Sequence, residues 1–215
     1  MQHSFIIGGF MKIIDLTQKL YDNIPVMAGD NEFRLFQDRF LAVDSYNGYR
    51  LETGLHVGTH IDTASHLTDN PVQICDIPLD RFTGNGVLID ARGKDVITAA
   101  DFSDTEIQRD DIVLVLTGTD KHFGQPCYFT DIPLMDESFA ELMVSRGVKM
   151  VGIDYFSPDK FPFKTHKILF AHDILVMENL TNLDQLLNLN FTVTALPLKL
   201  AAEASLVRAA AFVGE

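Results

Sequence analysis

Three of the seven histidines fall within eleven residues that also contain a carboxylate, in the segment HVGTHIDTASH from His56 to His66. Neutral imidazole and carboxylate are the usual protein ligands of zinc and of harder divalent metals. A straight strand would hold His56 and His60 about 13 Å apart, and a helix would turn Asp62 away from them. We therefore expect a bend at Gly58 that gathers His56, His60 and Asp62 around a metal, with His66 nearby.

Two other interpretations of this segment stay open. The histidines could be surface or hydrogen-bonded residues that cluster by chance, or they could hold a purely structural metal. Structural zinc usually has a closed shell of four ligands that is rich in cysteine. The segment contains no cysteine, and the nearest one, Cys75, has no CxxC partner. The composition therefore favours an open, catalytic shell.

The pattern His-x-Gly-Thr-His-x-Asp-x-x-x-His resembles the signature of the putative cyclase family of metal-dependent hydrolases, which includes bacterial kynurenine formamidase and isatin hydrolase. Ala64 stands where that family usually has proline. The segments Gly152–Asp159 and Glu178–Leu183 extend the resemblance over nearly the whole chain. The resemblance implies an α/β class and a single-domain swivelling β/β/α fold over residues 11–215, with residues 1–10 as an N-terminal extension.

The order of the expected elements independently indicates an α/β domain. Apolar runs predict buried strands, and apolar side chains at helical spacing, followed by Gly147, predict one helix. The strands are expected at 86–90, 111–118 and 148–154, and the helix at 136–146. Strand, helix, strand alternation is typical of α/β proteins, and because we find no repeat or linker, we expect one domain.

Glu178 is a second candidate ligand, since it ends the apolar run 174–177, where a carboxylate is costly unless it is paired or metal-bound. His166 lies twelve residues earlier and, by itself, would more often be structural. In family members with two zinc ions, the residues that match His166 and Glu178 bind the second metal, and the carboxylate that matches Asp62 bridges both. The resemblance therefore implies one or two ions per chain.

His66 is the candidate general acid and base of the expected reaction. The ordinary pKa of histidine, about 6.5, suits proton transfer near neutral pH. A metal site without turnover would not need this residue.

Met27 is the candidate substrate-binding residue. The loop Pro25–Asp30 resembles the family's Pro-x-aromatic-Pro-Gly-Asp loop, whose aromatic residue contacts substrate in kynurenine formamidases. Here Met27 holds the aromatic position and Ala28 that of the second proline. Met27 either contacts substrate or simply fills space in the loop. Near the C-terminus Arg208 is more readily explained by a structural ion pair than by substrate binding.

Composition limits the partners and the compartment. The net charge of −13 argues against nucleic acid and anionic membrane surfaces, which require basic patches. No apolar run reaches the ~18 residues of a membrane span. Two unpatterned cysteines, Cys75 and Cys127, favour a reducing, cytoplasmic location. The family suggests a homodimer or homotetramer.

Together these observations predict a metal-dependent hydrolase of a small amide or cyclic amide or ester, using zinc or manganese. The first alternative is an arylformamidase that acts on N-formyl aryl amines, against which Met27 and Ala28 count. The second alternative is a metal-binding protein without turnover, against which His66 counts.

Overall fold

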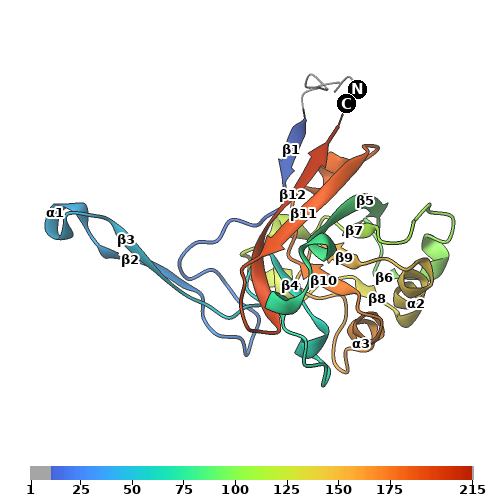
Figure 1. Ribbon diagram of the computed structural model, residues 1–215, viewed down its shortest axis with the longest axis horizontal. Helices are drawn as coiled ribbons and strands as arrows, with labels where there is room; N and C mark the ends of the chain where they lie inside the picture. The colour runs from blue at the N-terminus through green and yellow to red at the C-terminus, as the bar shows by residue number, and fades with distance from the viewer. Residues whose placement is uncertain (1–10, 215) are drawn as a thin grey trace, which may run out of the picture.

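The computed structural model describes residues 11–214 and is organised around one large mixed sheet (Figure 1). The predicted extension, residues 1–10, lies outside the described residues. Across the sheet the strands are β1 (Lys12–Asp15), β12 (Ala204–Val213), β11 (Phe191–Pro197), β5 (Thr83–Asp90), β7 (Ile112–Leu116), β9 (Met150–Ile153), β10 (Leu175–Glu178) and β4 (His60–Asp62).

The three-residue strand β4 closes this sheet on itself. One side of β4 pairs with β10, and the other side pairs with the first part of β12, where Ala204 lies opposite Asp62. The later part of β12 pairs with β1 instead. Because both edges of β4 are paired, it is fully buried, and no sheet edge stays open at this point.

The side chains of β7 alternate between two hydrophobic cores, one on each face of the sheet. Val113 and Val115 pack in the cluster beneath the helices, whereas Ile112, Leu114 and Leu116 pack in the cluster inside the closed sheet. Successive side chains of a strand point to opposite faces. Because both faces of β7 are buried, its sequence is a continuous apolar run, as noted above.

Helices α2 (Glu137–Arg146) and α3 (Lys164–Ala171) cover the outer face of the parallel strands (Figure 1). Helix α2 begins where Asp136 accepts a hydrogen bond from the Phe139 amide, and it ends at Gly147 in the left-handed conformation. The helix predicted at 136–146 and the three predicted strands are confirmed, with ends that differ by at most three residues. The α/β class is confirmed as well.

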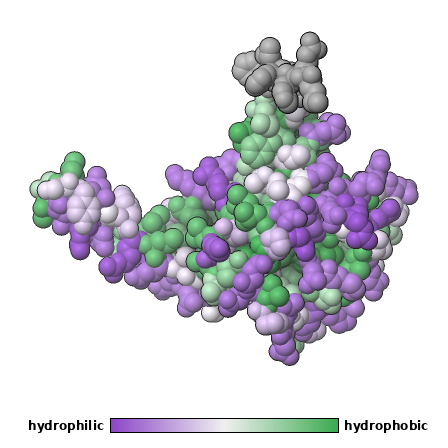
Figure 2. Space-filling model, in the orientation of Figure 1, coloured by the Kyte–Doolittle hydropathy of each residue, from purple (hydrophilic) through white to green (hydrophobic). Residues whose placement is uncertain are grey.

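A two-stranded arm, residues 34–52, projects from the body (Figure 1). It consists of β2 (Arg34–Arg39), the short helix α1 (Leu41–Asp44) and β3 (Gly48–Glu52). A second small sheet pairs β6 (Val96–Ile97) with β8 (Leu134–Met135). The arm carries several apolar side chains that are at least half exposed, so its surface mixes apolar and polar residues (Figure 2). Among residues 11–214 no helix is long and apolar enough to cross a membrane.

Candidate metal centre

The closing strand brings three of the predicted ligands together. His60 and Asp62 are two residues apart on β4 and share one face, while Ile61 between them enters the core of the closed sheet. Glu178, the last residue of β10, lies directly opposite His60 in the strand register. His60 Nε2 is 3.4 Å from Asp62 Oδ1 and 3.4 Å from Glu178 Oε2.

Gly58 supplies the bend that the sequence predicts. Its φ of +71° lies in the left-handed region, and a Cβ there would come within 2.5 Å of the Leu20 side chain. The bend turns the chain back on itself ahead of β4. As a result His56 Nδ1 lies 3.0 Å from Asp62 Oδ1.

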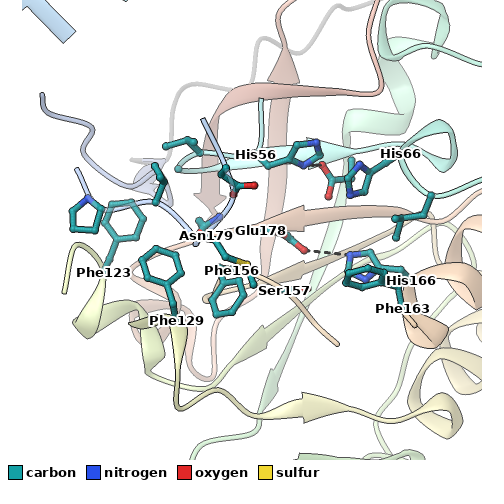
Figure 3. Close-up of a pocket in the computed structure, with 18 residues that line it drawn as sticks. His56, His66, Phe123, Phe129, Phe156, Ser157, Phe163, His166, Glu178 and Asn179 are labelled. Atoms are coloured by element: carbon teal, nitrogen blue, oxygen red, sulfur yellow. Dashed lines mark ion pairs between the residues drawn. The ribbon is translucent and has the colours of Figure 1, made fainter. Parts of the chain in front are cut away.

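His166 reaches the same cluster from a distant part of the chain. It lies in the first turn of α3, and its Nε2 is 3.3 Å from Glu178 Oε1 (Figure 3). The two oxygens of Glu178 therefore face two different histidines, His60 and His166. Glu178 joins the part of the cluster built on β4 to the part built on α3.

His66 completes the group from the short 3₁₀ turn Ala64–His66. Its ring lies 4.2 Å from the ring of His56, measured between centroids. Candidate ligand atoms of His56, Asp62 and His66 lie within 4.8 Å of one another. The geometry thus allows His66 either to bind an ion or to exchange a proton beside it.

Unpartnered buried atoms test whether a cation fits this cluster. Within residues 11–214, five buried side-chain atoms lack a hydrogen-bond partner, and three of them belong here: His60 Nε2, Asp62 Oδ1 and Glu178 Oε1. Each unsatisfied buried polar group costs about 1–3 kcal/mol. A single cation would satisfy all three, and a set of imidazoles and carboxylates suits zinc or manganese. The residues present therefore fit a divalent metal.

Burial and neighbouring charges act in opposite directions on these groups. Burial lowers the pKa of His60, but the carboxylates of Asp62 and Glu178 outweigh it and hold that pKa well above its usual range. Burial likewise lowers the pKa of His166, yet the neighbouring carboxylates of Asp159 and Glu178 raise it to about 9. Without a metal these imidazoles carry protons that a cation must displace, so metal binding weakens as the pH falls.

Each of three histidines has a partner on the ring nitrogen that faces away from the cluster. His60 Nδ1 donates to the Gly58 carbonyl at 2.7 Å, and His56 Nε2 lies 3.3 Å from Glu203. His166 Nδ1 lies 2.5 Å from Asp159 Oδ1. Metal-binding histidines usually have such a partner, which fixes the tautomer and the ring orientation.

Sequence reasoning missed Asp159 and Glu203. Asp159 ends the Gly152–Asp159 segment that resembles the family, so its position was a signal, although its role was not. Its second oxygen accepts the backbone amides of Thr165 and His166 at the start of α3. One carboxylate therefore both orients His166 and caps the helix that carries it.

A cavity of about 270 Å³ opens beside the cluster. His56, Asp62, His66, His166 and Glu178 form one side of its lining. The remainder is largely apolar and includes Met27, Phe123, Phe129, Phe156 and Phe163 (Figure 3). The four phenylalanines come from two connections, Phe123 and Phe129 from the one between β7 and β8 and Phe156 and Phe163 from the one between β9 and α3. No sequence pattern singled them out.

Met27 lies at the cavity, as the loop comparison predicts, and is 44% exposed. Lysine and arginine are absent from the residues that line this cavity in the described chain. Arg208 lies outside it and is paired with Asp15 at 2.7 Å, in line with the structural role favoured from the sequence.

Comparisons with known proteins give a family model and named relatives. The family model described as putative cyclase matches residues 14–160. An uncharacterised protein of Methanocaldococcus jannaschii is 33% identical, covering 88% of this chain and 92% of the relative. A kynurenine formamidase of Bacillus thuringiensis subsp. konkukian is 28% identical, covering 91% of this chain and 95% of the relative.

Solved structures share the fold, which confirms the predicted single-domain cyclase-like fold. Isatin hydrolase A from Labrenzia aggregata, bound to benzyl benzoate, superposes with a TM-score of 0.85 at 24% identity. The match covers 95% of this chain and 94% of that one.

Asp159→Asn tests whether Asp159 supports the metal centre by orienting His166. The variant keeps the shape of the side chain but removes the charge that orients His166, so we expect the affinity for zinc to fall about 10–100-fold. Competition with a chromogenic chelator measures this affinity. Asp104→Asn, at an exposed carboxylate on another loop, is the matched control; equal affinities in the two variants would contradict the assignment.

Proposed function

The chain belongs to the putative cyclase family, and from that premise we propose that it is a metal-dependent hydrolase of a small amide or of a cyclic amide or ester. One observation carries the proposal. The unpartnered buried atoms of His60, Asp62 and Glu178 converge, and two of these residues, Asp62 and Glu178, line a cavity of small-molecule size.

The donor set suggests how metal would be held. His56, His60 and Asp62 would bind one ion, and Asp62, His166 and Glu178 a second. Bound there, zinc or manganese would polarise the substrate carbonyl and lower the pKa of a water molecule toward ~7.

His66 would move the proton. It accepts a proton from the water as the water oxygen bonds to the carbonyl carbon. It then returns that proton to the leaving nitrogen or oxygen as the bond from that atom to the carbonyl carbon breaks, which gives an acid and an amine or alcohol. Burial lowers the pKa of His66, which keeps the imidazole neutral and able to accept the proton.

An arylformamidase remains the alternative substrate assignment. The Bacillus relatives are named kynurenine formamidases, and the phenylalanines of the cavity can contact an aryl ring. Met27 and Ala28 count against it because they replace the aromatic residue and the proline of the substrate loop. A metal-binding protein without turnover is disfavoured by His66, which lies in the cluster and also lines the cavity.

A panel of formamides, lactams and lactones, assayed with zinc and with manganese, tests the proposal. We expect hydrolysis of at least one class, abolished by chelator and restored by metal. Metal-loaded protein that hydrolyses no member of the panel would support the binding protein instead.

His66→Ala separates metal binding from chemistry. If His66 transfers the proton, the rate falls by roughly 10²–10⁴-fold while the metal content stays near that of the wild type. Elemental analysis and steady-state rates on one preparation measure both quantities. Equal loss of metal and activity would identify His66 as a ligand instead.

Met27→Trp tests the substrate loop. Aromatic stacking contributes about 0.5–1.5 kcal/mol, and a flexible methionine cannot hold a ring in one plane. We therefore expect N-formylkynurenine to be a poor substrate of the wild type and a better one of Met27→Trp, with kcat/KM as the measurement. A wild-type kcat/KM of ~10⁴ M⁻¹s⁻¹ or more would restore the arylformamidase.

We also propose that the protein is a homodimer or homotetramer assembled through the arm, residues 34–52. A two-stranded hairpin is at best marginally stable alone in water. The arm exposes Phe40, Leu41, Val43, Tyr46, Tyr49 and Leu51 by half or more. The rings of Phe40, Tyr46 and Tyr49 alone expose on the order of 300 Å². Two such arms and the surfaces that cover them would bury more than about 1,000 Å², the size of a specific interface.

Charge supports a second copy as the occupant of this surface. The arm holds three arginines and three carboxylates, whereas the chain carries a net charge of −13. A neutral arm can therefore approach an acidic copy without the repulsion that two acidic bodies would meet.

Sedimentation velocity tests the assembly. We expect the wild type to sediment as an oligomer and the double variant Val43→Asp, Tyr49→Asp to sediment as a monomer, since both side chains are mostly exposed within one chain. Val72→Asp, another exposed apolar position outside the arm, should leave the oligomer intact. A monomeric wild type at micromolar concentration would overturn this proposal.

A further inference from the structure

Asn179 directly follows Glu178 and lines the same cavity, yet it is only 3% exposed. Its backbone is fixed on both sides. The amide donates to the Tyr155 carbonyl at 2.9 Å, and its carbonyl accepts the Thr59 hydroxyl at 2.6 Å. The position of Asn179 beside the cluster is therefore set by the strands around it.

A buried phenol fixes the side chain of Asn179. Tyr128, which is fully buried in the short turn Pro126–Phe129, donates its hydroxyl to Asn179 Oδ1 at 2.7 Å. Asn179 Nδ2 makes no hydrogen bond to any residue from 11 to 214. Nδ2 is not among the fully buried atoms that lack a partner, so it is open to the cavity that Asn179 lines. A fixed side chain whose free donors face a cavity points to a ligand.

We propose that Asn179 donates a hydrogen bond from Nδ2 to the carbonyl oxygen of the substrate, and that Tyr128 positions it. This inference rests on the proposed function. As water adds to the carbonyl carbon, that oxygen gains negative charge, and the bond from Asn179 strengthens. A fixed donor of this kind stabilises the transition state more than the ground state.

The charges of the cavity explain why a neutral donor is placed here. Asp30, Asp62 and Glu178 line the cavity without any lysine or arginine among its described lining. A developing negative charge would be repelled by these carboxylates. The Asn179 amide donates hydrogen bonds without carrying a positive charge. It therefore does not compete with the metal for these carboxylates.

The conformation of Asn179 has a second explanation, which the experiment must separate. Its φ is +58°, and asparagine is favoured in the left-handed region. That preference accounts for asparagine at this position in the backbone. It does not account for the bond from Tyr128 or for the free Nδ2 at the cavity.

Asn179→Gly is the decisive variant because glycine tolerates positive φ and removes only the side chain. Asn188→Gly is the matched control, since Asn188 has a φ of +60° and is exposed. With the best substrate of the panel, we expect kcat of Asn179→Gly to fall about 10²–10³-fold with a smaller change in KM. Metal content should equal that of Asn188→Gly, whereas the melting temperature should be lower because the buried Tyr128 hydroxyl loses its partner.

Tyr128→Phe tests the positioning role, because it removes only the hydroxyl. We expect a smaller fall in kcat, on the order of 10-fold, and no further loss when it is combined with Asn179→Gly. Values of kcat within about 3-fold of the wild type in Asn179→Gly, or loss of metal in step with activity, would overturn the inference.

Binding of oxindole, a neutral aryl lactam, distinguishes failure of this inference from failure of the proposed function. Calorimetry on the zinc-loaded protein measures it without any turnover. We expect the Kd to rise about 10-fold in Asn179→Gly, the loss of one hydrogen bond of ~1.4 kcal/mol. An unchanged Kd, or no binding by the wild type, would count against Asn179 even if the panel finds no substrate.

Discussion

The pairing of β4 with both β10 and β12 is the constraint on which the rest of the structure depends. The strand has three residues; one enters the core of the closed sheet, and the other two, His60 and Asp62, face the metal cluster. Its register against β10 places Glu178 opposite His60. The contacts that close the sheet are thus the same contacts that assemble the site, so metal binding and closure of the sheet are thermodynamically linked.

The remaining groups are brought to this strand by supports of different kinds. The positive φ of Gly58 turns the chain so that His56 lies beside β4. Asp159 both caps α3 and orients His166. Each of these contacts fixes the orientation of a ligand side chain as well as its position, and a metal centre requires both. The cluster is left with unpartnered polar atoms at its centre and satisfied ones at its periphery, the arrangement expected of a site that binds a cation.

Local sequence signals predicted the elements well. The apolar runs predicted the buried strands, Asp136 and Gly147 predicted the ends of α2, and Gly58 predicted the bend. Each of these features depends only on residues that are neighbours in the sequence. The segment from His56 to His66 could be interpreted from its spacing alone. The cost of a carboxylate at the end of an apolar run singled out Glu178 as a ligand. Its link to this segment, and the role of His166, needed the family resemblance, since both residues approach the segment only through the pairing of β10 with β4 and the packing of α3. Asp159 and Asn179 lie in segments that resemble the family, but nothing in the sequence indicated their roles, and the phenylalanines of the cavity and Tyr128 had no local pattern at all. The aromatic residue missing at Met27 therefore does not leave the cavity without aromatic surface.

The central claim is that these imidazoles and carboxylates exist to hold a divalent metal. Elemental analysis of protein prepared without chelators tests it most directly, with enzyme activity measured on the same sample. The account predicts one or two divalent ions per chain in the wild type and their loss, together with activity, in His60→Ala. Fully active protein that contains no bound metal would contradict it.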